Sequence, residues 1–280
     1  SLRLGMKFLK VLAVKGRFHW GFWVRTPLTS SRQGTYVLPP PSTLIGALAY
    51  AYFAYLRARG VIIGEFLRDG YAEYLHKFAL GIDAVYFRPL DPFVAQIDIT
   101  RQFQAPYIRR ENLGDPQQWF NVRPVGKVYA PNSRFEVAYV VNEDFSRFHN
   151  QFCDEDYLFV LRRAAMSIVR LGPVEGLVTV EEVKAEDCKV GDLEMWDVPC
   201  PYFEVFDKWT PPMGWEVAEF FDWKDEEFWR SRISVKTRKY AVPAGFREGV
   251  VVPLRCRTLR TKSIRALKCS WGEYPWLVSS

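Results

Sequence analysis

The sequence predicts an α+β protein in which strands and helices alternate and a long insertion separates two of the strands. Three observations indicate this class. Residues 134–141 alternate as a strand, residues 39–60 form a proline-flanked apolar helix pattern, and an arginine-bearing segment interrupts the pattern between Pro89 and Arg134. With 280 residues, 49% of them hydrophobic and 16% aromatic, the chain can bury a sizeable core and should be globular rather than disordered.

The first predicted element is a long strand over residues 6–24, in which basic residues such as Arg17 alternate with apolar ones before a cluster of aromatics that includes Trp20. Interleaved basic and aromatic side chains suit phosphate neutralisation and base stacking on unpaired RNA. Aromatic residues on strands more often belong to a core. The polar loop that follows carries Arg25 and Arg32, which we expect to reach phosphates.

The next predicted element is a helix preceded by three consecutive prolines at residues 39–41. We expect the prolines to form an extended strut, Ser42 to cap a helix over 43–59, and Gly60 to end it. Because nearly every side of this helix is apolar, it should be buried against a sheet. The hydroxyls of Ser42 and Thr43 at its start suit a phosphate. Taken alone, however, the segment favours a capped core helix without a ligand.

The insertion between Pro89 and Arg134 is predicted to be a protruding finger, because it lies between two core strands and alternates polar or basic groups with aromatics. Arginine forks can clamp phosphates there while Phe103 or Tyr107 stacks on bases. The alternative is a surface hairpin with solvated arginines. Before the insertion, the expected elements are a helix over 65–78 and a strand over 82–88. Within it, they are a strand over 93–100, a basic and aromatic segment over 101–110 and a loop over 111–121.

The elements after the insertion complete a regular order. Without the finger, the chain reads strand, helix, strand, strand, helix, strand, which is the βαββαβ pattern of ferredoxin-like folds and RNA recognition motifs. The expected elements are a strand over 134–141, a helix over 154–170 and a strand over 177–183. The expected organisation is a domain over 1–190 with its insertion at about 89–134, followed by a smaller, mostly β region over 191–280.

The C-terminal region combines short strands with aromatic loops. Its stretch 216–229 is acidic and aromatic, and the tail 271–276 exposes aromatic residues unless they are covered, which makes it a candidate interface. Basic residues at strand spacing could contact RNA or an acidic subunit. They are Lys236, Arg238, Lys239, Arg255, Arg257 and Arg260.

Charge is strongly segregated along the chain, whose net charge is +6. Residues 1–64 carry nine Lys and Arg and no acidic residue, and residues 229–268 carry twelve basic residues against one Glu. Residues 175–227 carry sixteen acidic residues against four basic ones. This pattern indicates positive surfaces for a polyanion and an acidic surface that could face a basic partner, unless folding mixes the charges again.

Several classes of function are disfavoured. The five cysteines form no CxxC pair and the three histidines lie far apart, so we expect neither a zinc site nor another metal or cofactor. No apolar run is long enough to span a membrane and no secretion signal is present, so we expect a cytoplasmic protein. Five Asn against twenty-five Arg is typical of a thermophile, in which a structural disulfide is compatible with the cytoplasm.

The basic aromatic strand followed by Pro-Pro-Pro-Ser-Thr-Leu-Ile-Gly-Ala-Leu resembles the CRISPR-associated RAMP superfamily, and within it the fifth Cas family. Members of that family cap one end of type I (Cascade) interference complexes. The resemblance covers roughly the first sixty residues. A weaker one lies at residues 170–176, which are similar to the RAMP glycine-rich loop but carry Glu175 where a basic residue would favour RNA.

The resemblance implies a non-catalytic RNA-binding subunit of Cascade, most like the archaeal type I-A branch. It would cap the 5′ repeat-derived handle of the CRISPR RNA (crRNA) and contact the backbone and large subunits, with target DNA as a further partner and no membrane. The residues expected to bind RNA are Arg17, Arg25, Arg32, Ser42, Thr43, Arg101, Gln102, Phe103, Tyr107, Arg109, Arg110, Arg123 and Lys127.

Three alternatives stay open at this point. Some RAMP proteins cleave RNA without metal, so the chain could process precursor crRNA, with His19 and Tyr36 as weak candidates for general acid and base. It could instead be a scaffold that binds only protein, or the analogous subunit of a type III complex.

Overall fold

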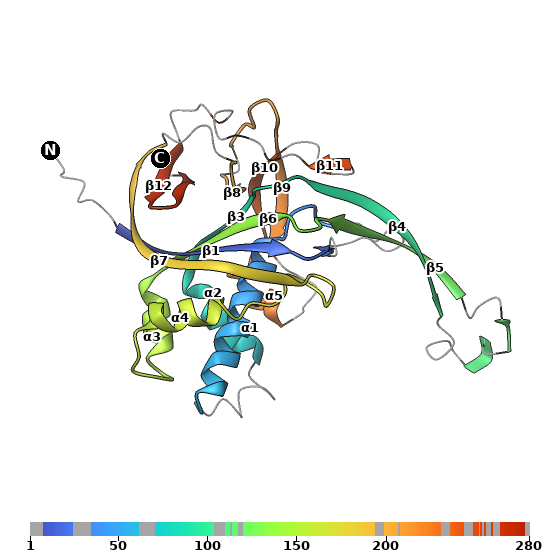
Figure 1. Cartoon of the computed structure of the whole chain (residues 1–280), viewed down its shortest axis with the longest axis horizontal. Helices are drawn as coiled ribbons and strands as arrows, with labels where there is room; N and C mark the ends of the chain where they lie inside the picture. The colour runs from blue at the N-terminus through green and yellow to red at the C-terminus, as the bar shows by residue number, and fades with distance from the viewer. Residues whose placement is uncertain are drawn as a thin grey trace.

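The computed structural model describes residues 8–24, 35–61, 71–103, 110–112, 114–116, 120–193, 199–206, 208–230, 236–243, 249–251, 253, 255, 259 and 264–277. It is a mixed α/β structure built on a curled antiparallel sheet of six strands in the order β13-β12-β7-β1-β6-β3 (Figure 1). The α+β class expected from the sequence is therefore confirmed. The six strands are β1 (Phe8–Phe18), β3 (Ile82–Pro89), β6 (Arg134–Val141), β7 (Val178–Asp192), β12 (Ile264–Cys269) and β13 (Gly272–Leu277).

The sheet has apolar cores on both faces. Alternate residues of β1 point to opposite sides, so Leu12 and Val14 join the core beneath the helices while Val11 and Ala13 join a second core. The second core packs against the C-terminal strands and includes Trp215. Because both faces are covered here, this part of the sheet offers no open platform on which bases could stack.

The first strand is shorter than predicted. β1 ends at Phe18, and after a bend at His19 and Trp20 the chain enters β2 (Gly21–Phe22), which belongs to a different sheet. A Cβ atom on Gly21 would lie 1.8 Å from the carbonyl oxygen of Val128, so glycine is required at this crossing. The prediction of one continuous strand over 6–24 was wrong because it overlooked this bend.

The first helix, α1 (Pro41–Ala58), begins two residues earlier than predicted. Pro40 is its N-cap residue and Pro41 occupies the first helical position, where the missing amide proton costs nothing. The predicted Ser42 cap was wrong, since no side chain caps this end and Ser42 is buried inside the first turn. The predicted burial of the helix is confirmed, with Leu44 and Leu48 fully covered.

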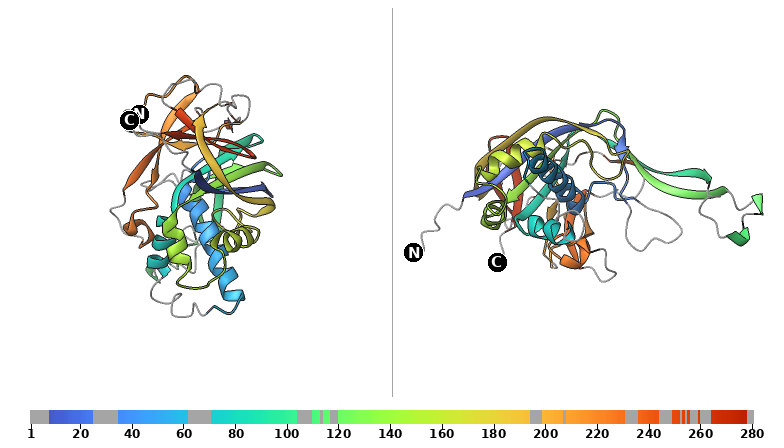
Figure 2. Two further views of the ribbon diagram at one scale, coloured as in Figure 1. Left: turned by 90° about the vertical axis from the view of Figure 1, so that its left-hand side faces the viewer. Right: turned by 90° about the horizontal axis from the view of Figure 1, so that it is seen from below.

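The insertion forms a long β-hairpin that projects away from the body of the molecule (Figures 1 and 2). Its strands are β4 (Phe93–Phe103) and β5 (Phe120–Tyr129), paired in register from Val94 opposite Tyr129 to Phe103 opposite Phe120. At its base the hairpin joins a four-stranded sheet in the order β11-β4-β5-β2, in which β11 spans Gly249–Val251. The name "finger" below means residues 93–129.

The helices pack on one face of the six-stranded sheet (Figure 1). They are α1, α2 (Tyr71–Leu80), α3 (Glu143–His149), α4 (Tyr157–Ala165) and the short α5 (Glu226–Trp229). The predicted helix over 154–170 was too long, because α4 ends at Ala165 and the chain then leaves the helical path. Val169, within the range of the predicted helix, is exposed beyond the end of α4, and α3 was not predicted.

The C-terminal residues form a three-stranded sheet and a hairpin. The sheet has the order β8-β10-β9, with β8 (Phe203–Glu204), β9 (Trp215–Phe221) and β10 (Thr237–Pro243). The hairpin β12–β13 pairs with β7, so the tail expected to expose aromatics instead buries Tyr274 in the second core. The division of the chain at residue 190 stays a prediction. The six-stranded sheet contains strands from both sides of that residue.

A disulfide between Cys188 of β7 and Cys269 of β12 joins residues that are 81 positions apart. The same two sulfurs and Glu186 are the one group of potential metal ligands found among the described residues, and sulfurs joined in a disulfide do not ligate a metal. None of the helices in the described part of the chain is both long and apolar enough to cross a bilayer.

A buried histidine links the first helix to α3. His149 is fully covered, and its Nε2 atom lies 2.9 Å from the carbonyl oxygen of Glu155, which can only accept. The proton therefore resides on Nε2, and Nδ1 accepts a 2.8 Å hydrogen bond from the Tyr52 hydroxyl. Burial lowers the pKa of His149, because the charged imidazolium would lose its hydration.

We expect this histidine to make stability depend on pH. Its folded-state pKa lies below the unfolded value of about 6.5, so its contribution is present above pH ~6.5 and is lost as the pH falls through the folded-state value. Urea unfolding at a series of pH values should show falling stability on acidification and a shallower dependence in His149→Gln. His19→Gln is the control, because His19 is exposed. Equal slopes in wild type and His149→Gln would contradict the assignment.

Candidate RNA interface

The finger carries the largest group of predicted RNA-binding residues. Arg101, Gln102 and Phe103 lie on β4, and Arg123 lies on β5 opposite Thr100, so the backbone register brings Arg101 and Arg123 to adjacent positions on neighbouring strands. Arg110 is exposed, and no described carboxylate pairs with it. Tyr107 and Arg109 lie outside the described residues, as do Arg25 and Arg32 of the loop.

Lys127, near the base of the finger, has a partner that the sequence analysis missed. Its Nζ atom lies 3.3 Å from Oδ2 of Asp98 on the opposite strand. The Tyr129 hydroxyl also donates to this carboxylate, and hydrogen bonds from Tyr129 and Gln96 lower the pKa of Asp98. Lys127 is thus already offset by a carboxylate in the free protein, and a phosphate would have to compete with Asp98 for it.

Arg17 at the end of β1 is likewise paired within the chain. Its Nε atom donates to Glu181 of β7 at 3.0 Å, and its Nη1 atom donates to Asn132 Oδ1 at 3.1 Å. The pair is part-exposed, so the guanidinium can still be approached, but it is held in place rather than free. Its carboxylate partner, 164 residues away in sequence, could not be assigned from spacing.

The start of α1 offers less to a phosphate than the sequence suggested. Ser42 is only 8% exposed, Pro41 has no amide proton, and the Thr43 amide already donates to the Pro40 carbonyl at 2.9 Å. The Thr43 side chain, in contrast, borders a surface pocket together with Gly172 of the facing loop. Thr43 is therefore the better placed of the two predicted hydroxyl residues.

The glycine-rich segment 170–176 lies against the start of α1. Gly172 has a φ of 87°, a conformation that disfavours other residues. A Cβ atom at this position would contact Val24 and Thr43. Glu175, noted as an obstacle to RNA contact, accepts a 3.2 Å hydrogen bond from the Trp23 indole. Glu175 therefore anchors this loop to the segment beside the finger.

A second pocket, of about 470 Å³ and mostly apolar, lies where the finger meets this loop. Trp20 borders it with 68% of its surface exposed, whereas its neighbour Phe18 is buried in an aromatic core with Phe22 and Phe135. Of the aromatics predicted on the first strand, Trp20 is thus free to stack and Phe18 is not. The described lining residues are Trp20, Gly21, Phe22, Trp23, Lys127, Val128, Tyr129, Val174, Glu175 and Leu177.

The two weak catalytic candidates are engaged with different elements. His19 Nε2 lies 2.8 Å from the Thr179 hydroxyl on β7. Tyr36 packs against Phe220 on β9, and burial raises its pKa to about 12. A phenol with that pKa stays protonated at neutral pH and is a poor general base. The described contacts do not bring these two residues together.

The predicted basic face of the C-terminal region is in part neutralised. Arg238 of β10 donates from Nη1 to Glu204 at 2.8 Å and also pairs with Asp222. Arg257 and Arg260 lie outside the described residues, and Lys236 is exposed. Of the described residues on this face, Arg238 is therefore neutralised by carboxylates of its own chain.

Comparison with known proteins identifies the family. The sequence model of the family described as "CRISPR-associated protein (Cas_Cas5)" matches residues 19–244. The chain therefore belongs to the Cas5 family of CRISPR-associated proteins, and the resemblance found in the sequence is confirmed.

Relatives in Saccharolobus solfataricus support this membership. The chain is 29% identical over 182 residues to "CRISPR-associated protein Cas5 2", a match covering 64% of this chain and 62% of that protein. It is 32% identical over 180 residues to "CRISPR system aCascade subunit Cas5 1", covering 62% of this chain and 64% of that protein. The chain thus spans less than two thirds of the length of these curated relatives.

A solved structure shares the fold. "Crystal structure of a CRISPR protein from Archaeoglobus fulgidus" superposes with a TM-score of 0.52 at 14% identity, covering 96% of this chain and 100% of that chain.

Proposed function

We propose that this chain is a non-catalytic RNA-binding subunit of a type I Cascade of the archaeal I-A kind, which binds and caps the 5′ repeat-derived handle of crRNA. The observation that carries the proposal is the projecting finger, with arginines on both of its paired strands in a member of the Cas5 family. A ribbon that extends from the body and carries arginine residues on both strands suits the backbone of a single strand. The backbone and large subunits are the proposed protein partners.

The arrangement of the central strands supports a ferredoxin-like core. The strands β7-β1-β6-β3 are adjacent and antiparallel, and α1 and α4 each connect two of them. Numbered along the βαββαβ unit, this order is 4-1-3-2. The covered sheet faces indicate that RNA would be held at the finger, the glycine-rich loop and the start of α1 instead of on the sheet.

We also propose a cytoplasmic location in a thermophile. The arginine-rich, asparagine-poor composition supports it, and the disulfide between Cys188 and Cys269 fits, since intracellular proteins of hyperthermophiles are often disulfide-rich.

We expect the chain to bind unpaired handle RNA without cutting it. Labelled handle RNA titrated with the purified chain should show saturable binding that weakens with salt, by ~0.7 in the log-log slope for each phosphate neutralised. Precursor crRNA incubated with the chain in chelator should stay intact. Cleavage that is lost in His19→Ala would establish the endoribonuclease alternative, and absence of RNA binding would favour a protein scaffold.

A further inference from the structure

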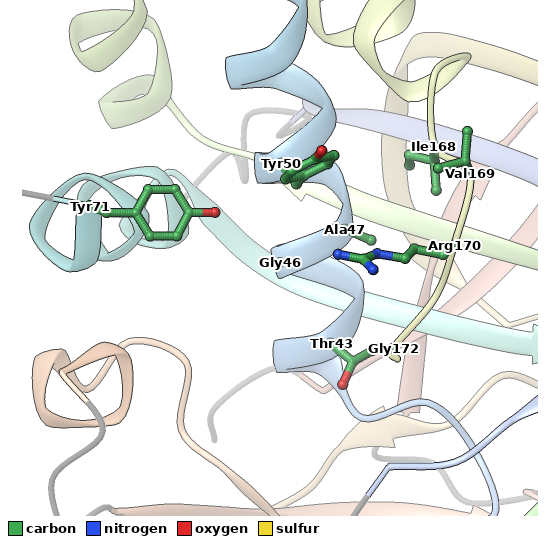
Figure 3. Close-up of a pocket in the computed structure, with 9 residues that line it drawn as sticks. All are labelled: Thr43, Gly46, Ala47, Tyr50, Tyr71, Ile168, Val169, Arg170 and Gly172. Carbon is green, nitrogen blue, oxygen red and sulfur yellow. The ribbon is translucent and has the colours of Figure 1, made fainter. Parts of the chain in front are cut away.

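A small pocket lies between the first half of α1 and the segment 168–172 (Figure 3). Its volume of about 300 Å³ is at the lower end of the range for ligand sites, so it suits one compact group and not a length of chain. The described lining residues are Thr43, Gly46, Ala47, Tyr50, Tyr71, Ile168, Val169, Arg170 and Gly172.

Two tyrosines supply aromatic surface to this pocket. Tyr50 stands on α1 with 56% of its surface exposed, and Tyr71 at the start of α2 points its hydroxyl toward α1 (Figure 3). Burial raises the pKa of Tyr71, and the nearby Tyr50 hydroxyl raises it further, so this phenol stays a donor at neutral pH. A half-exposed ring on a rigid helix is a ready stacking surface.

Arg170 supplies positive charge. Its guanidinium lies 5.9 Å from the centre of the Tyr50 ring and extends across the helix beside Gly46 and Ala47 (Figure 3). Within the described part of the chain, no carboxylate lines the pocket or pairs with Arg170. The Thr43 hydroxyl lies in the first turn of α1, at the end of the pocket away from Tyr50 (Figure 3). The described residues of the site therefore join an aromatic face to a positive charge that none of their carboxylates offsets, which disfavours a cation and favours a planar group that carries an anion.

Small residues on α1 leave the space open. A Cβ atom built on Gly46 would meet no atom within 4 Å, so a larger side chain is sterically permitted here and would fill the pocket. Helix propensity also favours almost any other residue at this interior position. Neither backbone conformation nor core packing explains the glycine, whereas an occupant of the pocket does.

We propose that this pocket receives one unpaired nucleotide of the bound RNA, its base against Tyr50 and Tyr71 and its phosphate at Arg170 and Thr43. The inference rests on the proposed function and assigns a nucleotide pocket to the surface between the glycine-rich loop and α1, away from the finger. Residues 168–172 border this pocket, and residues 174–177 of the same loop border the apolar pocket at the base of the finger. A strand leaving the finger would thus cross one short loop to reach Tyr50.

The test is a set of unpaired RNA oligonucleotides of about 12 nucleotides, within the usual site size, each with 2-aminopurine at one position. Wild type should change the fluorescence strongly at one position, where the base stacks. Gly46→Leu should abolish that change and weaken binding about ten-fold or more, without lowering the melting temperature. Tyr50→Phe should retain the change and Tyr50→Ala should lose it.

The contribution of the positive charge of Arg170 to RNA binding is tested separately. Arg170→Ala should weaken binding and lower the salt slope by ~0.7, whereas Arg57→Ala, an exposed arginine at the other end of α1, should change neither. If Gly46→Leu and Tyr50→Ala bind like wild type while a shortened finger loses binding, the pocket proposal is wrong and the RNA-binding function stands. If wild type binds none of the oligonucleotides, the proposed function fails, and the pocket proposal fails with it.

Discussion

Replacing Arg88 by methionine is expected to lower the free energy of unfolding by about 3–5 kcal/mol, because it leaves a buried carboxylate without its counter-charge. Arg88 and Glu136 are opposite each other on β3 and β6, are 3% and 2% exposed, and are joined by a 2.9 Å hydrogen bond. Arg88 also donates to the Glu273 carbonyl at 2.6 Å, and the Tyr274 hydroxyl donates to Glu136 at 2.6 Å. The cluster ties β13 to the far edge of the curled sheet.

Chemical denaturation of three variants measures this effect. Arg88→Met/Glu136→Gln should recover much of the loss, since the uncompensated charge is gone. Arg134→Met is the matched control, because its pair with Asp91 is exposed and should contribute at most about 1 kcal/mol. An Arg88→Met variant no less stable than Arg134→Met would show that the buried pair does not hold the sheet closed.

Shortening the finger is expected to weaken RNA binding about a hundred-fold or more at physiological salt, because it removes several phosphate contacts together. Asp98 and Val125 are opposite in the register, so residues 99–124 can be replaced by Asn-Gly, which favours a tight hairpin turn. The variant lacks Arg101, Arg109, Arg110 and Arg123 and retains the base of the hairpin. The fold should persist, because the removed segment projects from the body (Figure 1).

A second variant separates the contribution of the arginine charges to RNA binding from that of the length of the finger. Changing the same four arginines to glutamine keeps the finger at full length, and should lower the salt slope by roughly 3 if each guanidinium meets one phosphate. Melting curves of both variants should match wild type. Handle RNA binding unchanged in either its affinity or its salt slope would mean that the finger does not hold RNA.

Local patterns were sufficient for the elements whose signals lie within one segment. The strand over 134–141 agrees with β6 residue for residue, and the insertion at 89–134 contains the finger. The start of α1 was misplaced because the preference for Ser at a cap was weighed above the tolerance for proline at the first helical position. The C-terminal hairpin was missed because its pairing with β7 is a tertiary contact.

The candidate site was less predictable because its electrostatics depend on distant partners. Arg17 and Lys127 looked like free cations in sequence, yet Glu181 and Asp98 face them across neighbouring strands. Arg170, Tyr50 and Tyr71 meet through packing of α1, α2 and a loop, which no spacing rule joins. An arginine at the end of the predicted helix and at the start of the glycine-rich segment was the available signal for Arg170.

The most direct measurement is photo-cross-linking of handle RNA carrying 4-thiouridine to the full chain, with the modified peptides identified by mass spectrometry. Adducts are expected in the finger and in the segments around Tyr50 and 168–177. Adducts confined to the acidic residues 203–230, with the finger and α1 unmodified, would contradict the proposed RNA interface.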